Sequence, residues 1–301
     1  MAEVTASLVK ALRDRTGAGM MDCKAALTET QGDMEQAVDW LRKKGLSKAA
    51  KKADRVAADG LIGVTVKNGT GAVVEINSET DFVARNDKFQ ELVRTIGALA
   101  PAAKGDLAKL NASTVPGQGV SVDEHLKNAI ATIGENMSLR RTAALSVKDG
   151  VVADYVHNKA ADGLGKIGVL VALESKADKA ELSTLGRQIA MHIAAASPAA
   201  VSAEQLDPAL IERERAVYTE QAKASGKSAE IAAKMVEGRL RKEFFQQVVL
   251  LQQVFLGAGG DGKATVEQVL KDAEKKAGAP VKIAGFVRYA LGEGIDKPAA
   301  E

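Results

Sequence analysis

Two glycine-rich runs have the spacing of loops that hold nucleotide phosphates. Residues 163–168 read Gly-Leu-Gly-Lys-Ile-Gly, the spacing of the dinucleotide fingerprint, and residues 257–263 have the spacing of a phosphate-binding loop. The fingerprint requires a helix after it, whereas residues 169–173 are apolar and predict a strand. In the second run, Ala264 stands where a magnesium-binding serine or threonine is required. Neither run therefore predicts a nucleotide site.

Side chains suited to nucleophilic or metal chemistry are few and scattered. The chain has one cysteine, Cys23, and three histidines, His125, His157 and His192. None of them has metal-ligand spacing to another, and no serine–histidine–acid or cysteine–histidine arrangement is indicated. We expect His192 to be packed or to cap a helix, and His157 to end a strand. The sequence therefore predicts no catalytic residue, no metal site and no cofactor, and we expect the protein not to be an enzyme.

A polar run at residues 78–86 carries a single aromatic side chain between a predicted strand and a predicted helix. Thr80 and Asp81 can cap a helical turn through their side-chain oxygens, which would point Phe82 outward on a short support. Two interpretations remain open at this point. Phe82 and Val83 either fill the local core, the commoner fate of a loop aromatic, or Phe82 is an anchor for a pocket on a partner protein.

The middle of the chain repeats itself. Asp-Gly-Leu-Ile opens a predicted strand at residues 59–67, and Asp-Gly-Val-Val opens another at residues 149–157. Each strand leads through a hairpin to a returning strand and then to a helix with apolar residues at helical spacing. The second copy has a plain loop at residues 175–179 where the first copy carries Phe82, which weakens the core-filling interpretation. The repeat predicts two related α+β subdomains, each a small antiparallel sheet backed by helices.

Helical segments flank and interrupt these two subdomains. Residues 4–45 predict three short helices, the third of which ends at Gly45. Residues 207–245 predict a helical hairpin with a thin apolar stripe, which we expect to project from the body. The expected divisions are a three-helix module at 1–46, a basic connector at 47–58, a first α+β subdomain at 59–148, a second at 149–206 and 246–296, the hairpin at 207–245 and a tail at 297–301.

Composition limits the classes of function. The chain has 301 residues, a formal net charge of +2 and 3% aromatic residues, which argues against a dedicated nucleic-acid-binding protein. A single cysteine fits a reducing compartment. The first ten residues lack a signal-peptide pattern, and no apolar run is long enough to span a bilayer. We therefore expect a cytoplasmic protein with no stable nucleic-acid partner and no membrane partner.

Four runs resemble the elongation factor Ts family. They are Thr-Asp-Phe-Val-Ala-Arg-Asn at residues 80–86, Leu-Arg-Asp-Arg-Thr-Gly-Ala-Gly-Met-Met-Asp-Cys-Lys at 12–24, Ile-Gly-Glu-Asn at 133–136 continuing to the arginine pair at 140–141, and Lys-Met-Val-Glu-Gly-Arg at 234–239. The resemblance covers nearly the whole chain and implies that the N-terminal module is related to ubiquitin-associated domains. The chain departs from the family pattern at residues 244–263.

The resemblance implies a guanine-nucleotide exchange factor that binds elongation factor Tu carrying GDP, dislodges its magnesium ion and promotes exchange for GTP. Asp81 and Phe82 match residues that press against the nucleotide domain of the partner, and Thr80 and Val83 complete that element. Partner-binding positions are matched by Arg13, Met20, Met21, Lys24, Ile133 and His157. The family also has a helical protrusion, so self-association through the hairpin stays open.

Two other classes of protein remain as alternatives. The three-helix module could belong to an adaptor that binds ubiquitin-like partners. The basic connector, with Lys48, Lys51, Lys52 and Arg55, could instead belong to an RNA-binding translation accessory.

Overall fold

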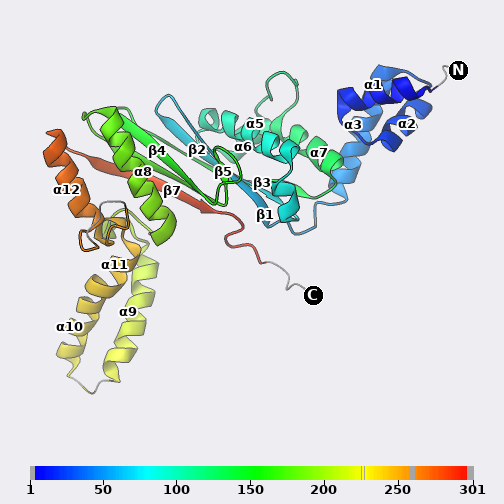
Figure 1. Ribbon diagram of the computed structural model, residues 1–301. Coiled ribbons are helices and arrows are strands. Elements are labelled where there is room, and N and C mark those ends of the chain that lie inside the picture. Colours follow the sequence, from blue (N-terminus) through cyan, green and yellow to red (C-terminus); the bar gives the residue numbers. More distant parts are fainter. Residues whose placement is uncertain (1–3, 225, 227, 258–261, 297–301) are drawn as a thin grey trace.

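The computed structural model describes residues 4–224, 226, 228–257 and 262–296 (Figure 1). The N-terminal part contains α1 (Ala6–Thr16), α2 (Met20–Glu29), α3 (Met34–Ala50), β1 (Asp59–Lys67), β2 (Thr70–Ser78), α4 (Asp81–Ala84), α5 (Asp87–Ala103), α6 (Leu107–Ala112), α7 (Val122–Ile133) and β3 (Met137–Ser146). The C-terminal part contains β4 (Gly150–His157), β5 (Leu164–Gly165), β6 (Ile167–Glu174), α8 (Lys179–Ala196), η1 (Ala203–Gln205), α9 (Pro208–Lys223), α10 (Ala229–Arg239), the π-helix η2 (Leu240–Phe244), α11 (Phe245–Val248), η3 (Leu250–Gln252), α12 (Val266–Ala277) and β7 (Lys282–Ala290). This mixture of helices and small antiparallel sheets confirms the expected α+β class.

Helices α1, α2 and α3 form the N-terminal module around a small core that includes Leu12, Cys23 and Leu27. Helix α3 runs through Gly45 to Ala50, so the expected end at Gly45 is wrong. A Cβ atom at Gly45 would lie 3.1 Å from the Cβ of Ala131 in α7. The glycine therefore lets α3 approach α7 closely instead of ending the helix, and the first residues of the expected connector extend α3.

Two antiparallel sheets pack face to face between layers of helices. Within the described chain, one sheet has the order β3-β2-β1-β5 and the other β4-β6-β7. Leu61 on β1 faces the helical side that includes α5, whereas its neighbour Ile62 faces the second sheet, because successive strand residues point to opposite faces. The other face of the second sheet packs against α8 and α12. The resulting order of layers is helix, sheet, sheet, helix.

The contact between the sheets is close, and sequence reasoning missed it. A Cβ atom at Gly168 would lie 2.5 Å from Cγ2 of Ile62 and 2.7 Å from Cγ2 of Val64, so only glycine fits there. The enlarged hairpin of the second copy also supplies β5, which pairs with β1 in the first sheet through Ile62 and Gly165. The two copies are thus interleaved.

The strands predicted from the repeat are present. The β1–β2 hairpin closes at Asn68 and Gly69, both with positive φ, as in a tight two-residue turn. The sequence of residues 142–148 and 281–291 also predicts strands, and these correspond to β3 and β7. Strand β3 begins earlier, at Met137, whereas β7 is slightly shorter than predicted. The boundaries of the expected divisions stay predictions, and the tail at 297–301 lies outside the described residues.

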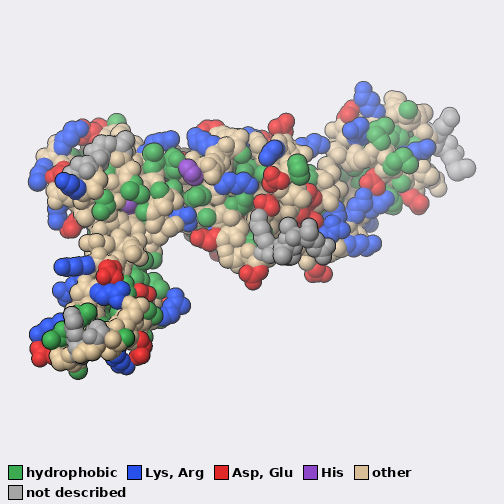
Figure 2. Space-filling view, turned by 60° about the horizontal axis from the view of Figure 1, so that its bottom comes forward, with side chains coloured by type: hydrophobic (Ala, Val, Ile, Leu, Met, Phe, Trp, Pro, Cys, Tyr) green, Lys and Arg blue, Asp and Glu red, His purple; other side chains and the backbone are tan. Residues whose placement is uncertain are grey.

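Helices α9 and α10 form an antiparallel pair that projects from the body as a separate lobe (Figures 1 and 2). A narrow core of Tyr218, Ala222, Val236 and Leu240 joins them, in keeping with the thin stripe in the sequence. Residues 225 and 227 of the predicted turn lie outside the described residues. Basic and acidic side chains are mixed over the visible face of the molecule (Figure 2).

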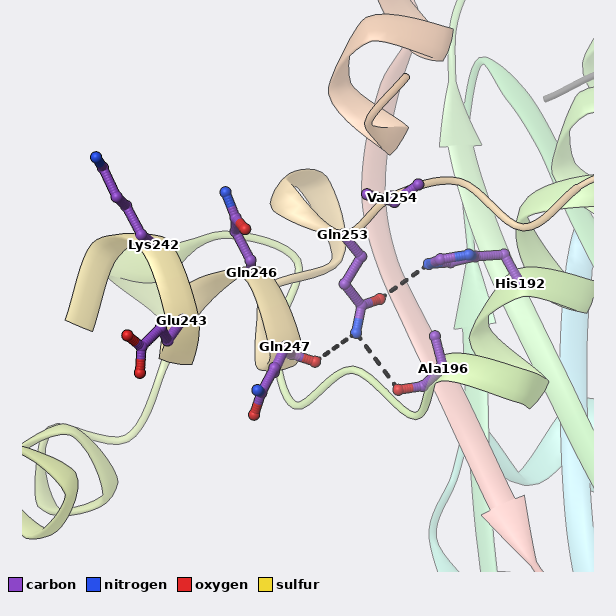
Figure 3. Close-up of a pocket in the computed structure, with 8 residues that line it drawn as sticks. All are labelled: His192, Ala196, Lys242, Glu243, Gln246, Gln247, Gln253 and Val254. Carbon is purple, nitrogen blue, oxygen red and sulfur yellow. Dashed lines mark hydrogen bonds between the residues drawn. The ribbon is translucent and has the colours of Figure 1, made fainter. Parts of the chain in front are cut away.

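The base of this hairpin is tied to α8 by one buried glutamine. The Nε2 amide of Gln253 donates to the carbonyls of Gln247, at 2.6 Å, and Ala196, and its Oε1 lies 2.9 Å from Nε2 of His192 (Figure 3). Nδ1 of His192 accepts from the backbone N–H of Leu256, so Nε2 carries the proton that Gln253 accepts. Burial lowers the pKa of His192, although the hydrogen bond with Gln253 opposes this. His192 is thus packed, as expected.

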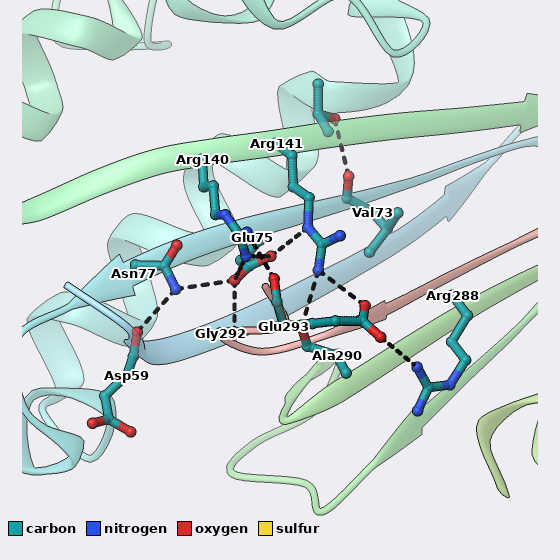
Figure 4. Close-up of polar contacts among 11 residues, drawn as sticks. Asp59, Val73, Glu75, Asn77, Arg140, Arg141, Arg288, Ala290, Gly292 and Glu293 are labelled. Atoms are coloured by element: carbon teal, nitrogen blue, oxygen red, sulfur yellow. Dashed lines mark hydrogen bonds and ion pairs between the residues drawn. The ribbon is translucent and has the colours of Figure 1, made fainter. Parts of the chain in front are cut away.

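A buried carboxylate joins the first sheet to the C-terminal segment. The carboxylate of Glu75 on β2 accepts hydrogen bonds from Nε of Arg141 at 2.5 Å, Nη1 of Arg140 at 3.1 Å and the backbone N–H of Gly292 at 2.8 Å (Figure 4). Burial alone would raise the pKa of Glu75, but the hydrogen bonds from Gly292, Asn77 and Arg141 outweigh it and hold the pKa below its ordinary value. This charged cluster fixes residues that follow β7 against the edge of the first subdomain.

Candidate functional site

Helix α4 is a single turn that presents one aromatic ring to solvent. The side chain of Phe82 is 75% exposed, while the next two residues, Val83 and Ala84, are buried at 6% and 4% exposure in the core of the first subdomain. The exposure of Phe82 excludes the interpretation in which its ring fills the local core. Val83 and Ala84 instead attach the turn to the body, so that the ring stands on a short support whose other face is packed.

Thr80 holds this turn differently from what the sequence suggested. It occupies the N-cap position of α4, but its side chain caps no backbone N–H, so the expected capping bond is wrong. Its Oγ1 instead donates to Oε1 of Glu135 at 2.7 Å, and its backbone N–H donates to Oε2 of the same carboxylate at 3.0 Å. Both oxygens of Glu135 are therefore used to fix the start of α4.

Glu79, the residue before Thr80, makes a hydrogen bond to the same part of the chain in the opposite direction, as the acceptor. Its Oε1 accepts the backbone N–H of Asn136 at 2.5 Å, and Arg55 lies 3.5 Å from the same oxygen. Residues 134–136, which we call the support loop, are thus joined to the residues before α4 by hydrogen bonds in both directions. No local pattern predicts this pairing, because the partners are 55 and 57 residues apart in the chain.

The end of α4 is also fixed. The side chain of Asn86 accepts a hydrogen bond from the backbone N–H of Lys88 at 2.9 Å and caps α5. Arg85 lies 3.4 Å from Asp81 on the exposed side of the turn. Phe82 is therefore flanked by one acidic and one basic side chain, on a turn held at both ends.

The candidate residues of the N-terminal module are all on its surface. Met20 and Met21, at the start of α2, are 43% and 78% exposed, so neither belongs to the core of the module. Arg13 on α1 and Lys24 on α2 are exposed as well. Exposed methionines in a small helical module are suited to an adaptable contact surface.

The module is docked on the first subdomain through α3 and α7. Arg42 pairs with Glu124 at the start of α7, and Nζ of Lys52 donates to the carbonyl of Gly134 in the support loop. The backbone N–H of Glu124 also donates to Oγ of Ser121, but the Glu124 carboxylate pairs with Arg42, so only half of a capping box forms. The exposed methionines and Phe82 therefore belong to parts of the chain in direct contact.

Ile133 and His157 occupy different places relative to α4. Ile133 ends α7, packs partly against the core of the first subdomain and directly precedes the support loop. His157 ends β4, is exposed, and its Nδ1 lies 3.1 Å from the hydroxyl of Tyr155. Asn158, the next residue, lines a cleft together with Asp81 of α4. The structure thus brings the support loop to α4 directly, whereas His157 is connected to α4 only through its neighbour Asn158, which lines that cleft.

The described residues offer little for bond-making chemistry. No group of three or more His, Cys, Asp or Glu side chains able to hold a metal ion occurs among them. Cys23 is buried, and burial raises the pKa of its thiol, which keeps it protonated. In the dinucleotide-like run, Leu164–Gly165 is strand β5, and strand β6 follows. Residues 258–261 of the phosphate-loop-like run lie outside the described residues. Among the helices that are described, none is long and apolar enough to cross a membrane.

Comparison with known proteins assigns the family. A family model described as "Elongation factor TS" matches residues 79–293. The chain is 60% identical over 297 residues to the elongation factor Ts of Parvibaculum lavamentivorans, covering 99% of this chain and 95% of the relative. It is 59% identical over 300 residues to that of Maricaulis maris and 57% identical over 297 residues to that of Rhizobium etli, with the same coverage. The chain therefore belongs to the elongation factor Ts family of translation elongation factors.

Proposed function

We propose that the protein is the guanine-nucleotide exchange factor for elongation factor Tu and that α4 is the element that acts on the partner. The observation that carries this proposal is the 75% exposed ring of Phe82 on a turn whose neighbouring residues are buried. An exposed aromatic is a costly surface feature that a partner's pocket would explain, and aromatic anchors of this kind dominate protein interfaces. A match to a translation factor family supports the choice of partner.

In the proposed mechanism Phe82 enters between helices of the nucleotide domain of elongation factor Tu. Asp81 contacts the same domain beside it. Thr80 and Val83 act from behind, since one is bound to Glu135 and the other is buried in the core. The displaced helices carry the magnesium ligands of the partner, so the ion leaves, GDP loses its main counter-charge, and GTP can take its place.

The coupling is reciprocal. The exchange factor weakens GDP binding only by as much as it binds the nucleotide-free partner more tightly than the GDP-bound partner. A release rate raised by about ten thousand corresponds to about 5.5 kcal/mol, whereas one aromatic anchor supplies about 2–4 kcal/mol. We therefore propose that further binding energy comes from Arg13, Met20, Met21 and Lys24 on the N-terminal module and from Ile133 and His157.

The remaining parts of the proposal follow from this role. The chain itself would catalyse no covalent reaction and need no cofactor, because the chemistry it controls is the dissociation of a ligand held by another protein. It would act in the cytoplasm, without a stable nucleic-acid or membrane partner. The projecting α9–α10 hairpin is available for self-association or for a further contact.

The test is release of fluorescent GDP from elongation factor Tu. We expect the parent protein to accelerate release and Phe82→Ala to slow it by about a hundredfold while its unfolding transition is unchanged. Leu256→Ala is a matched control, since it removes another exposed apolar side chain, 63% exposed, far from α4 in the sequence. Parent-like exchange by Phe82→Ala, or loss of its folded structure, would refute the assignment of the wedge to α4.

A further inference from the structure

A cleft with a positive lining lies beside Phe82 and has no role in the proposal above. We call it the basic cleft. Its floor is apolar and includes Leu61 of β1 and Ala84 of α4. Arg85 and Asp81 of α4 line one side of it. The other side comes from the enlarged hairpin between β4 and β6, with Lys159 and Lys166. Three cationic side chains therefore face one carboxylate.

The cations of the basic cleft are incompletely neutralised. Arg85 lies 3.4 Å from Asp81, and Lys159 lies 3.7 Å from Asp162, in two exposed and loose pairs. Lys166 is half-buried, and no acidic side chain of the described chain lies within ion-pair distance of its ammonium group. A partly buried ammonium without a counter-charge gains when an anion is brought to it.

The backbone that carries these lysines is firmly held. The N–H of Val64 donates to the carbonyl of Gly163 at 2.9 Å, and Leu164 is buried at 2% exposure. Lys166 itself bonds through its backbone to both neighbours, donating to the carbonyl of His157 and accepting from the N–H of Leu291. The enlarged hairpin is thus fixed against the first sheet by β5, which places its lysines opposite α4.

We infer that the basic cleft receives acidic side chains of the partner GTPase, next to the pocket that takes Phe82. This inference rests on the proposed function. It is supported by charge complementarity and by continuity, because the cleft shares α4 with Phe82 and adjoins His157 through Asn158. The cleft therefore joins two contact elements that are 75 residues apart in the sequence, and Lys166 is the residue in it that most needs an anion.

The test compares the concentration of exchange factor required for half-maximal GDP release. We expect Lys166→Gln to raise this concentration about tenfold, the loss of one charge-assisted hydrogen bond, and to leave the saturated rate unchanged. The salt dependence of association should become shallower. Lys166→Arg should retain parent behaviour, because it keeps the charge.

Lys176→Gln is the matched control. Lys176 is exposed and follows β6, whereas Lys166 precedes it, so the two lysines are separated by the length of that strand, about 25 Å. We expect this variant to match the parent. An unchanged half-maximal concentration for Lys166→Gln would overturn the inference, and so would a loss in the saturated rate alone.

A second measurement separates this inference from the proposed function. Calorimetric affinity for nucleotide-free elongation factor Tu does not depend on exchange, so Lys166→Gln should weaken it about tenfold even if the parent failed to release GDP. Failure of the parent to bind the GTPase at all would overturn both proposals. Binding of fluorescent GDP to the protein alone, abolished by Lys166→Gln, would make the cleft a nucleotide site and overturn the inference only.

Discussion

Replacing Glu135 by alanine tests whether α4 must be held stiffly to work. Glu135 lies outside α4, in the support loop, and its two oxygens bind Thr80 at 2.7 and 3.0 Å. The substitution removes both bonds without touching Phe82, Val83 or Ala84. It should therefore leave the exposed ring in place and remove only the support behind it.

The expected magnitude follows from those two bonds. A hydrogen bond to a charged group contributes about 1.5–3 kcal/mol when buried, and Glu135 and Thr80 are only half-buried, so we take about 2 kcal/mol for both together. Val83 and Ala84 still hold the turn in the free protein. In the proposed mechanism, the loss of the two hydrogen bonds therefore matters when α4 displaces the partner's helices. A loss of about 2 kcal/mol sets an upper limit of about thirtyfold, and we expect about tenfold slower exchange.

The assay is GDP release from elongation factor Tu at limiting exchange factor, together with urea unfolding of each variant. Glu135→Gln keeps one acceptor and should lose about threefold, since about one bond of two remains. Glu91→Ala, which removes an exposed carboxylate paired with Arg94 on the neighbouring α5, should behave as the parent. Parent-like exchange by Glu135→Ala would show that burial of Val83 and Ala84 is sufficient, and the reasoning about the support loop would be wrong.

Two further predictions concern stability and the N-terminal module. Glu75→Gln should lower the free energy of unfolding by about 3 kcal/mol, because it leaves Arg140 and Arg141 without their buried partner; equal unfolding midpoints in urea would contradict this. The folded pKa of Glu75 lies below the unfolded value of about 4.3, so its stabilisation is complete above that pH and is lost as the pH falls through the folded pKa. Glu75→Gln should therefore reduce the loss of stability on the acid side. Unfolding measured from roughly pH 3 to pH 6, where carboxylates titrate, would show this. The double variant Met20→Ala and Met21→Ala should unfold like the parent, since both side chains are exposed, and bind elongation factor Tu about tenfold more weakly in calorimetry; unchanged affinity would remove the module's methionines from the interface.

The repeat in the sequence predicted most of the fold. Alternating apolar residues and the Asn68-Gly69 turn are local signals, and they located β1 and β2 well. Helical spacing likewise identified the buried face of α5. What the repeat could not reveal is how the two copies meet, because the fit of Gly168 against Ile62 depends on residues more than 100 positions apart.

Helix α3 illustrates why local rules failed at one boundary. A glycine after a run of helical residues is a common C-terminal signal, and Gly45 has that position. Its backbone stays helical because the absence of a side chain lets α7 pack directly against it. The energy that decides between ending and continuing the helix comes from a tertiary contact, which no window of sequence around Gly45 contains.

In the candidate site, too, some features could be predicted from the local sequence, whereas others depend on contacts between residues far apart in the chain. The absence of a counterpart in the second copy and the resemblance of its run to a family signature together singled out Phe82, and the ring's exposure follows from the buried residues beside it. The hydrogen bonds of Thr80 to Glu135 were beyond prediction, since they join the two ends of a 55-residue interval.

The support loop gives this distant pairing a functional consequence. In residues 134–136, the carbonyl of Gly134 accepts a hydrogen bond from Lys52 in the segment after α3. Glu135 in the same loop binds Thr80 at the start of α4. The segment that follows the N-terminal module and the turn that carries the exposed ring are therefore both attached to the same short loop. Binding energy gained by the module can then act on Phe82 only if that loop does not yield. In the proposed complex, a flexible connector would let the module bind while α4 stayed outside its pocket. The continuous α3 docked on α7 would instead make the two proposed contacts cooperative.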